Sequence, residues 1–148
     1  MRAGNPKPFH YGGGLKDLCK YGNFADSRSA YNARIVAKCA ENPSPEGHGA
    51  GSYQPNGWGL HNMIGNAFEL TEDCASENYH GAPADGSPWR AGGAQCESFA
   101  TRSYFFDSIG TALRSAARCT AVGMEDRSNG LAIRVAVSLD DAACDRKK

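Results

Sequence analysis

The pattern of hydrophobic and polar positions along this chain predicts only short elements. Residues 131–139, LAIRVAVSL, are apolar at alternate and adjacent positions, which is typical of a strand. Residues 98–106, SFATRSYFF, also have strand-like content. Residues 26–41 predict a short helix with weak apolar spacing and a stop before Pro43, and residues 111–118 predict one or two helical turns.

The segments between these elements are rich in turn-forming residues. Residues 1–14, 42–57 and 81–96 hold clustered glycine and proline, which predicts irregular loops. The chain has 18 glycines and 7 prolines among 148 residues, and this composition leaves little room for long helices. We therefore expect one domain, residues 1–139, with its function in loops, and a polar tail at residues 140–148.

Charge and hydropathy exclude several classes of function. The 16 basic and 16 acidic residues balance, so nothing indicates electrostatic capture of nucleic acid or of an anionic membrane. No apolar run approaches the roughly 18 residues that a membrane helix needs. The first residues, MRAGNPKPFHYGGG, show no apolar signal-peptide region. A cytosolic protein, or a piece of a longer one, is expected on this ground.

Cysteine content allows two interpretations. No CxxC pair occurs, which argues against a structural zinc site, and six cysteines permit 15 disulfide pairings. Pairing of neighbours would close loops of about 20–25 residues, each stabilising by roughly 3 kcal/mol. Reduced thiols in a cytosolic protein are the alternative. The cysteines are Cys19, Cys39, Cys74, Cys96, Cys119 and Cys144.

Residues 56–70, NGWGLHNMIGNAFEL, combine flexible backbone with large apolar side chains. Glycines here permit positive φ where the chain must turn sharply. Carbonyl oxygens in such turns, an asparagine oxygen and the Glu69 carboxylate form the set of hard ligands that Ca²⁺ takes. Alternatively, Asn62 and Asn66 cap turns and Glu69 pairs with an arginine. The apolar positions expected in the core are Leu60, Met63, Ile64, Ala67, Phe68 and Leu70.

The longer stretch YQPNGWGLHNMIGNAFEL resembles the signature of the formylglycine-generating enzyme (sulfatase-modifying factor) family, which reads much like P-P-N-x-F-G-L-Y-D-M-x-G-N-V-W-E-W. RAGNPKPFHYG, LCKYGNFAD and LRSAAR resemble other family motifs in the same order. The resemblance covers residues 2 to about 139. Family members usually carry a further segment before the first of these motifs, so a fragment of a longer protein is expected.

The resemblance implies an α/β (α+β) fold, glycine-rich and related to C-type lectin-like domains, with short strands, few short helices and long loops. It also implies a Ca²⁺ site made of the Asn62 side chain, the carbonyls of Gly65 and Ala67, and Glu69. A second family site would use Asn23, the Phe24 carbonyl and the loop near Asn42. Because family members usually place an aspartate in that loop, where this chain reads CAENPSP, Asn42 or Glu41 would have to substitute.

Bacterial relatives that share the cysteine pattern imply two disulfides, Cys19–Cys39 and Cys74–Cys96. These bonds would favour an oxidising compartment, periplasmic or secreted. Cys119 and Cys144 are left over, and they either pair or stay free.

The catalytic motif of the family is altered in this chain. Formylglycine-generating enzymes oxidise a cysteine of a sulfatase peptide with O₂ and a copper ion held between two cysteines, because soft thiolates suit Cu(I). The corresponding interval, residues 103–118, contains no cysteine. The family's R-G-G-S-W is RSYFF here, and its active-site tryptophan is Phe68. Copper and catalytic residues are therefore not expected, unless Cys96 and Cys119 meet across the groove.

A ligand-binding groove is expected where the family binds substrate. Aromatic side chains there would supply contact area, and so affinity, for a peptide or small molecule. Arg102 would orient this ligand. Arg114, Arg118 and Arg134 are equally explained as structural ties to carbonyls and carboxylates. The expected groove residues are Phe68, Arg102, Tyr104, Phe105, Phe106 and Ser108.

The leading prediction is a non-catalytic, Ca²⁺-stabilised binding or accessory module. Three alternatives stay open. The chain could be an active sulfatase modifier, the C-terminal part of an ergothioneine-synthase-like enzyme, or a variable binding protein of the kind that diversity-generating retroelements produce.

Overall fold

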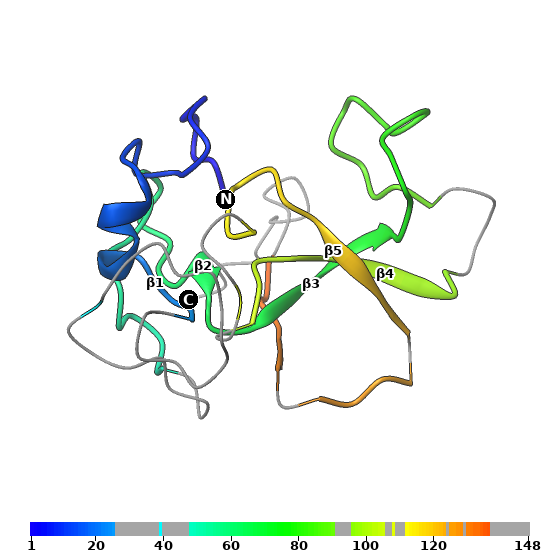
Figure 1. Ribbon diagram of the computed structural model, residues 1–148. Coiled ribbons are helices and arrows are strands. Elements are labelled where there is room, and N and C mark those ends of the chain that lie inside the picture. Colours follow the sequence, from blue (N-terminus) through cyan, green and yellow to red (C-terminus); the bar gives the residue numbers. More distant parts are fainter. Residues whose placement is uncertain are drawn as a thin grey trace, which may run out of the picture.

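Short strands and long connections make up the computed structural model (Figure 1), which describes residues 1–25, 39, 48–90, 96–105, 108, 112–123, 125–128 and 130–136. Its elements are the 3₁₀ helix η1 (Leu15–Lys20) and the strands β1 (Gly22–Asn23), β2 (Ile64–Gly65), β3 (Phe68–Cys74), β4 (Ser98–Arg102), β5 (Cys119–Gly123) and β6 (Leu131–Ala132). Among the described residues, no helix has the length and apolar character needed to cross a membrane.

The main sheet is mixed and has the strand order β5-β4-β3-β6. β3 pairs antiparallel with β4, and β4 antiparallel with β5. β6 runs parallel to β3, with Phe68 opposite Leu131 and Glu69 opposite Ala132. The pairing of β3 with β6 thus joins the centre of the chain to its C-terminal third.

A second, two-stranded unit holds β1 parallel to β2. Gly65 sits at this contact with a φ of +66°, and a Cβ there would overlap the Asn23 carbonyl oxygen. Only glycine satisfies both constraints, because it tolerates the left-handed region and has no side chain. Figure 1 shows η1, β1 and β2 together at one end of the molecule, with the main sheet at the other.

The buried core cluster lies at the η1–β1–β2 end. It is built from segments far apart in sequence, so burial of apolar side chains holds the loops together. Its members are Phe9, Leu18, Phe24, Ile64 and Leu113, with Tyr11, Leu15, Cys19, Tyr21, Cys39 and Tyr104 packed against them.

Two disulfides add covalent ties. Cys19 of η1 is bonded to Cys39, and Cys74 at the end of β3 is bonded to Cys96, just before β4. This is the pairing that the family resemblance implied. The Cys119 side chain and Cys144 lie outside the described residues.

The elements expected from the sequence are found in shortened form. β4 ends at Arg102 because Ser103 takes a φ of +61° and leaves the extended region. In the described part of the predicted 131–139 strand, residues 131–136, β6 covers two residues, and beyond it Val135 is 94% exposed. Residues 112–118 form turns rather than helix, so that prediction was wrong for the described part. The predicted 26–41 helix lies outside the described residues, except for Cys39.

Burial in the 56–70 stretch also differs from expectation. Met63 and Ile64 are buried, but Leu60 and Leu70 are exposed, so the prediction of core positions was wrong for these two leucines. Positive φ occurs at Gly59 and Gly65, as expected for glycine. It also occurs at Asn62 and Asn66, for which the sequence predicted no positive φ. The architecture as a whole is the expected α/β fold with few helices, whereas the relation to C-type lectins stays a prediction.

Candidate functional site

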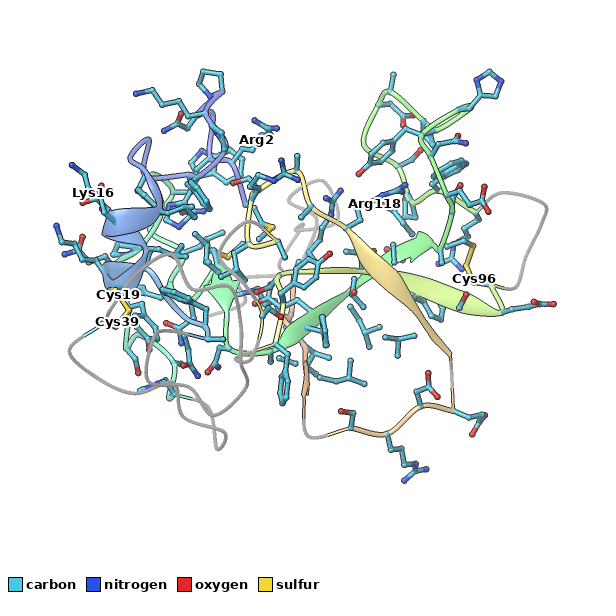
Figure 2. The ribbon with its side chains drawn as sticks, viewed as in Figure 1. Arg2, Lys16, Cys19, Cys39, Cys96 and Arg118 are labelled. Atoms are coloured by element: carbon cyan, nitrogen blue, oxygen red, sulfur yellow. A yellow bond between two sulfur atoms is a disulfide. The ribbon has the colours of Figure 1, made fainter. Side chains whose placement is uncertain are left out.

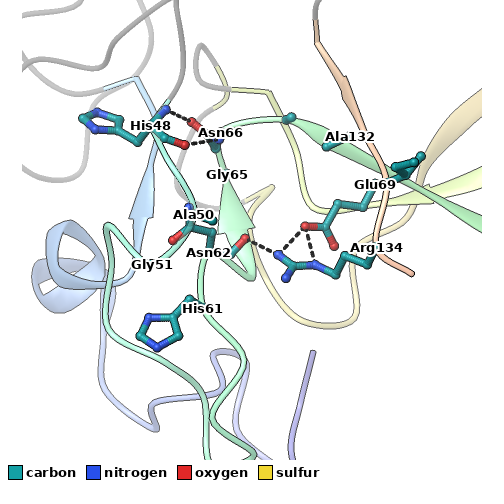
Figure 3. A pocket seen from close by; sticks show the side chains of 12 residues that line it. His48, Ala50, Gly51, His61, Asn62, Gly65, Asn66, Glu69, Ala132 and Arg134 are labelled. Carbon is teal, nitrogen blue, oxygen red and sulfur yellow. Dashed lines mark hydrogen bonds and ion pairs between the residues drawn. The ribbon is translucent and has the colours of Figure 1, made fainter. Parts of the chain in front are cut away.

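All four residues of the expected Ca²⁺ set line one pocket of ≈ 250 Å³. The four residues come from the turns around β2 and the start of β3, and Figure 3 shows Asn62, Gly65 and Glu69 among them. Left-handed φ values at Asn62 and Gly65 produce these turns, since they reverse the backbone within a few residues. The local sequence therefore folds so that the four predicted ligand residues line one cavity.

Glu69 forms an ion pair with Arg134 inside this pocket. The Arg134 Nε and Nη2 atoms donate to Glu69 Oε1 at 2.8 and 2.6 Å, and Nη2 also donates to the Asn62 carbonyl at 2.9 Å (Figure 3). The Glu69 side chain is largely buried, so this contact is less screened than a surface pair. The Glu69 Oε2 atom has no hydrogen bond among the described residues.

The donor set suits a hard cation, because every candidate ligand atom is an oxygen. Besides Glu69 Oε1, two of these oxygens already accept hydrogen bonds. Asn62 Oδ1 accepts from the Tyr53 N–H at 3.3 Å, and the Gly65 carbonyl accepts from Ser103 Oγ at 3.0 Å. Within the described part of the chain, no group of three or more His, Cys, Asp or Glu side chains is arranged to hold a metal. A Ca²⁺ site does not require such a group of side chains, since carbonyl and amide oxygens can supply most of its ligands.

Asn23 and Phe24, expected at the second metal site, are both buried. Asn23 Nδ2 donates to Asn66 Oδ1 at 3.2 Å, and the Asn23 carbonyl accepts from the Asn66 N–H at 2.8 Å. Asn42 lies outside the described residues. The described half of this site thus ties β1 to the turn after β2.

Aromatic rings gather where the ligand-binding groove was expected. The Phe68 ring centroid lies 5.8 Å from that of Tyr104 and 6.1 Å from that of Phe105. Ser108 is close in the chain, and its N–H donates to the Phe105 carbonyl at 3.0 Å. Phe106 lies outside the described residues. We call Phe68, Tyr104 and Phe105 the aromatic cluster.

Arg102 contacts a different set of residues. Its Nη1 donates to the Ala117 carbonyl at 3.1 Å, and its Nη2 donates to the Tyr79 hydroxyl at 2.6 Å. Arg118 lies over the Tyr79 ring, 4.0 Å from its centroid. Sequence reasoning did not single out Tyr79, because its only signal is its place in a glycine- and proline-rich loop.

The cysteines offer no thiolate pair among the described side chains. Cys96, the nearest cysteine before the altered catalytic interval, is buried and bonded to Cys74. A disulfide sulfur is not the thiolate that Cu(I) requires. The alternative in which Cys96 and Cys119 together hold copper is therefore incompatible with this bond.

The fold and these motifs define a sulfatase-modifying-factor type of domain. The family model described as "Sulfatase-modifying factor enzyme 1-like domain" matches residues 9–139, and the chain belongs to this family. Among solved structures, the chain is similar to "Structure of PvdO from Pseudomonas aeruginosa", with 29% identity and a TM-score of 0.61. That likeness covers 88% of this chain but 45% of the PvdO chain, so this chain spans less than half of PvdO. No curated protein matches its sequence.

Proposed function

We propose that this chain is a non-catalytic member of its family, a Ca²⁺-stabilised module that binds a peptide or small ligand. The bond between Cys74 and Cys96 is the observation that carries the proposal. Residues 97–118 hold no cysteine, and no histidine follows His80 in the sequence. With Cys96 consumed in a disulfide, the altered catalytic interval lacks the soft ligands on which copper oxidation depends.

The aromatic cluster supports the binding role. The Phe68 ring lies near the rings of both Tyr104 and Phe105. Aromatic rings offer apolar area at low cost in side-chain entropy, which is typical of recognition surfaces. Phe68, Tyr104 and Phe105 are all half-buried, so each keeps part of its surface accessible. The two disulfides favour a module that works in an oxidising compartment.

Calcium is the structural part of the proposal. Asn62 Oδ1, the carbonyls of Gly65 and Ala67, and Glu69 would hold the ion, since all four residues line one pocket. The ion would supply positive charge to carbonyl oxygens and a carboxylate that converge in a tight loop. Arg134 already places one positive charge there, so ion binding would require its guanidinium to release or share Glu69.

Incubation of the protein with a Cys-x-Pro-x-Arg peptide, copper and a reductant in air tests the non-catalytic role. Mass spectrometry is expected to find the peptide thiol unchanged, with or without copper. The Cys119→Ser variant is the matched control, because Cys119 is the cysteine that follows the altered interval. Copper-dependent formation of an aldehyde in the wild type, absent from the variant, would overturn the proposal.

A further inference from the structure

A second pocket, of ≈ 420 Å³, shares no lining residue with the one that contains Glu69, although Glu69 lies opposite Arg102 in the β3–β4 pairing. It is formed where the N-terminal segment meets the loop after β3 and the loop that leads into β5. Figure 1 shows the N-terminal segment beside that last loop, and Figure 2 places Arg2 next to it. The lining residues are Met1, Arg2, Tyr79, Arg102, Ser115 and Ala116, and none of them carries a carboxylate.

Guanidinium groups in and beside this pocket have only neutral partners among the described residues. Arg102 is held by the Ala117 carbonyl and the Tyr79 hydroxyl, which leaves its Nε–H uncommitted. Arg2 donates through Nη1 to the Pro6 carbonyl at 3.0 Å. Arg118 donates to the Ser76 carbonyl at 2.9 Å while it covers the Tyr79 ring. The hydrogen-bond partners of these three guanidinium groups thus carry no charge.

Ser115 gives an independent indication of a missing ligand. The residue lines the pocket and is 6% exposed, yet its buried hydroxyl has no hydrogen-bond partner. Its backbone N–H is satisfied by the Pro8 carbonyl at 2.8 Å, so only the side chain is left over. A buried hydroxyl without a partner is unfavourable. Of the six buried side-chain polar atoms without a partner in the described part of the chain, Ser115 Oγ is the one that belongs to a residue of this pocket. An acceptor atom bound in the pocket would satisfy it.

We propose that this pocket binds the anionic group of a ligand, a carboxylate or a phosphate. A guanidinium whose orientation is already fixed recognises a planar or tetrahedral oxyanion with little further loss of entropy. The Ser115 hydroxyl supplies one more donor, and Tyr79, whose ring Arg118 covers, borders the adjacent part of the ligand. The inference rests on the ligand-binding role proposed above, and it locates the charged end of the ligand beside Arg102.

Isothermal titration calorimetry of the full chain tests the inference with three probes. Succinate and inorganic phosphate represent the two sources of negative charge, and succinamide is the neutral control of matching shape. At least one anion is expected to give a saturable heat that weakens as sodium chloride increases, whereas succinamide gives none. The anion that binds shows whether the pocket recognises a carboxylate or a phosphate. If neither anion binds, the proposal is overturned. This assay measures binding and not oxidation. Absence of anion binding would therefore leave the proposal that the chain is non-catalytic unaffected.

Variants locate the binding. Arg102→Gln is expected to weaken anion binding at least about tenfold, because a hydrogen bond to a charged group is lost. Ser115→Ala is expected to weaken it about fivefold while the melting temperature stays the same or rises, since the variant removes an unsatisfied hydroxyl. Arg127→Gln, at an exposed position outside the pocket, is the control and keeps wild-type affinity. Unchanged affinity in Ser115→Ala and Arg102→Gln would overturn the assignment of the site.

Discussion

At the scale of single residues, His10 is a buried titratable group without polar contacts to its ring. The ring meets the rings of Tyr11 and Tyr21 edge-on, at centroid distances of 5.4 and 5.3 Å, and neither ring nitrogen is hydrogen-bonded. Burial lowers the pKa of His10 below its ordinary value of 6.5. The unfolded chain therefore binds a proton more readily than the folded protein in the pH range just below 6.5.

This difference predicts a loss of stability on mild acidification. As the pH falls below 6.5, protonation of His10 in the unfolded chain lowers the free energy of unfolding, and the loss ends below the folded-state pKa. His10→Phe keeps an aromatic ring and removes the titration, so its stability should fall less between pH 7.5 and pH 5. Urea denaturation at the two pH values measures this. His80→Gln, at an exposed histidine, should behave like the wild type, and equal acid sensitivity in His10→Phe would refute the prediction.

Gly65 is the second residue whose environment permits a quantitative prediction. Alanine there would be strained by the positive φ and would also meet the Asn23 carbonyl oxygen, which is backbone and cannot move aside alone. Gly59 has a similar φ of +77°, but a Cβ there would meet nothing within 4 Å. Gly59→Ala should cost about 1 kcal/mol from strain alone, and Gly65→Ala at least about 2 kcal/mol more. Equal losses in urea denaturation would show that the close contact between β1 and β2 is absent.

At the scale of elements, disulfides replace much of the regular structure that a longer helix or strand would supply. The Cys74–Cys96 bond closes the connection between β3 and β4, across a sequence separation of 22 residues. Cys19–Cys39 anchors η1 to a segment 20 residues further along. Each bond restricts the unfolded chain, since a closed loop has fewer conformations than an open one.

Peptide mapping without reduction should recover the fragments joined through Cys19–Cys39 and Cys74–Cys96. The double variant Cys74→Ser/Cys96→Ser should lose about 3 kcal/mol of unfolding free energy on the chain-entropy estimate. The control compares the unfolding free energy of the wild-type protein before and after reduction of its disulfides. A fragment that joins Cys74 to Cys119 would contradict this pairing.

At the scale of the whole molecule, Ca²⁺ is predicted to couple the Glu69 pocket to global unfolding. An ion that binds only the folded state stabilises it by about 2.7 kcal/mol at a hundredfold excess over Kd. Thermal melts should therefore show a higher melting temperature with Ca²⁺ than with EDTA.

Two glutamates of the same strand give a matched pair of variants for these melts. Glu69→Gln should abolish most of the effect of Ca²⁺, because it removes the one carboxylate of the expected ligand set. Glu72→Gln loses only an exposed ion pair to Arg90 and should keep the effect. A wild-type melting temperature that does not respond to EDTA would contradict the calcium proposal.

The sequence by itself determined the features that depend on local spacing. The motif around residues 56–70 indicated the family, and the family resemblance named Asn62, Gly65, Ala67 and Glu69, which line one pocket. The absence of cysteine from residues 103–118 is likewise visible without a structure. Such features are readable because a turn of a few residues is specified by the residues within it.

Only the tertiary structure decided which distant groups meet. Arg134 reaches Glu69 across 65 residues of sequence, and Arg102 joins Tyr79 rather than the aromatic cluster. The pairing of β6 with β3 joins segments about 60 residues apart, and Ser115 shares a pocket with Arg2 and Arg102 only in the folded chain. No local pattern encodes these contacts, because the packing of the whole chain selects each partner from many chemically equivalent ones.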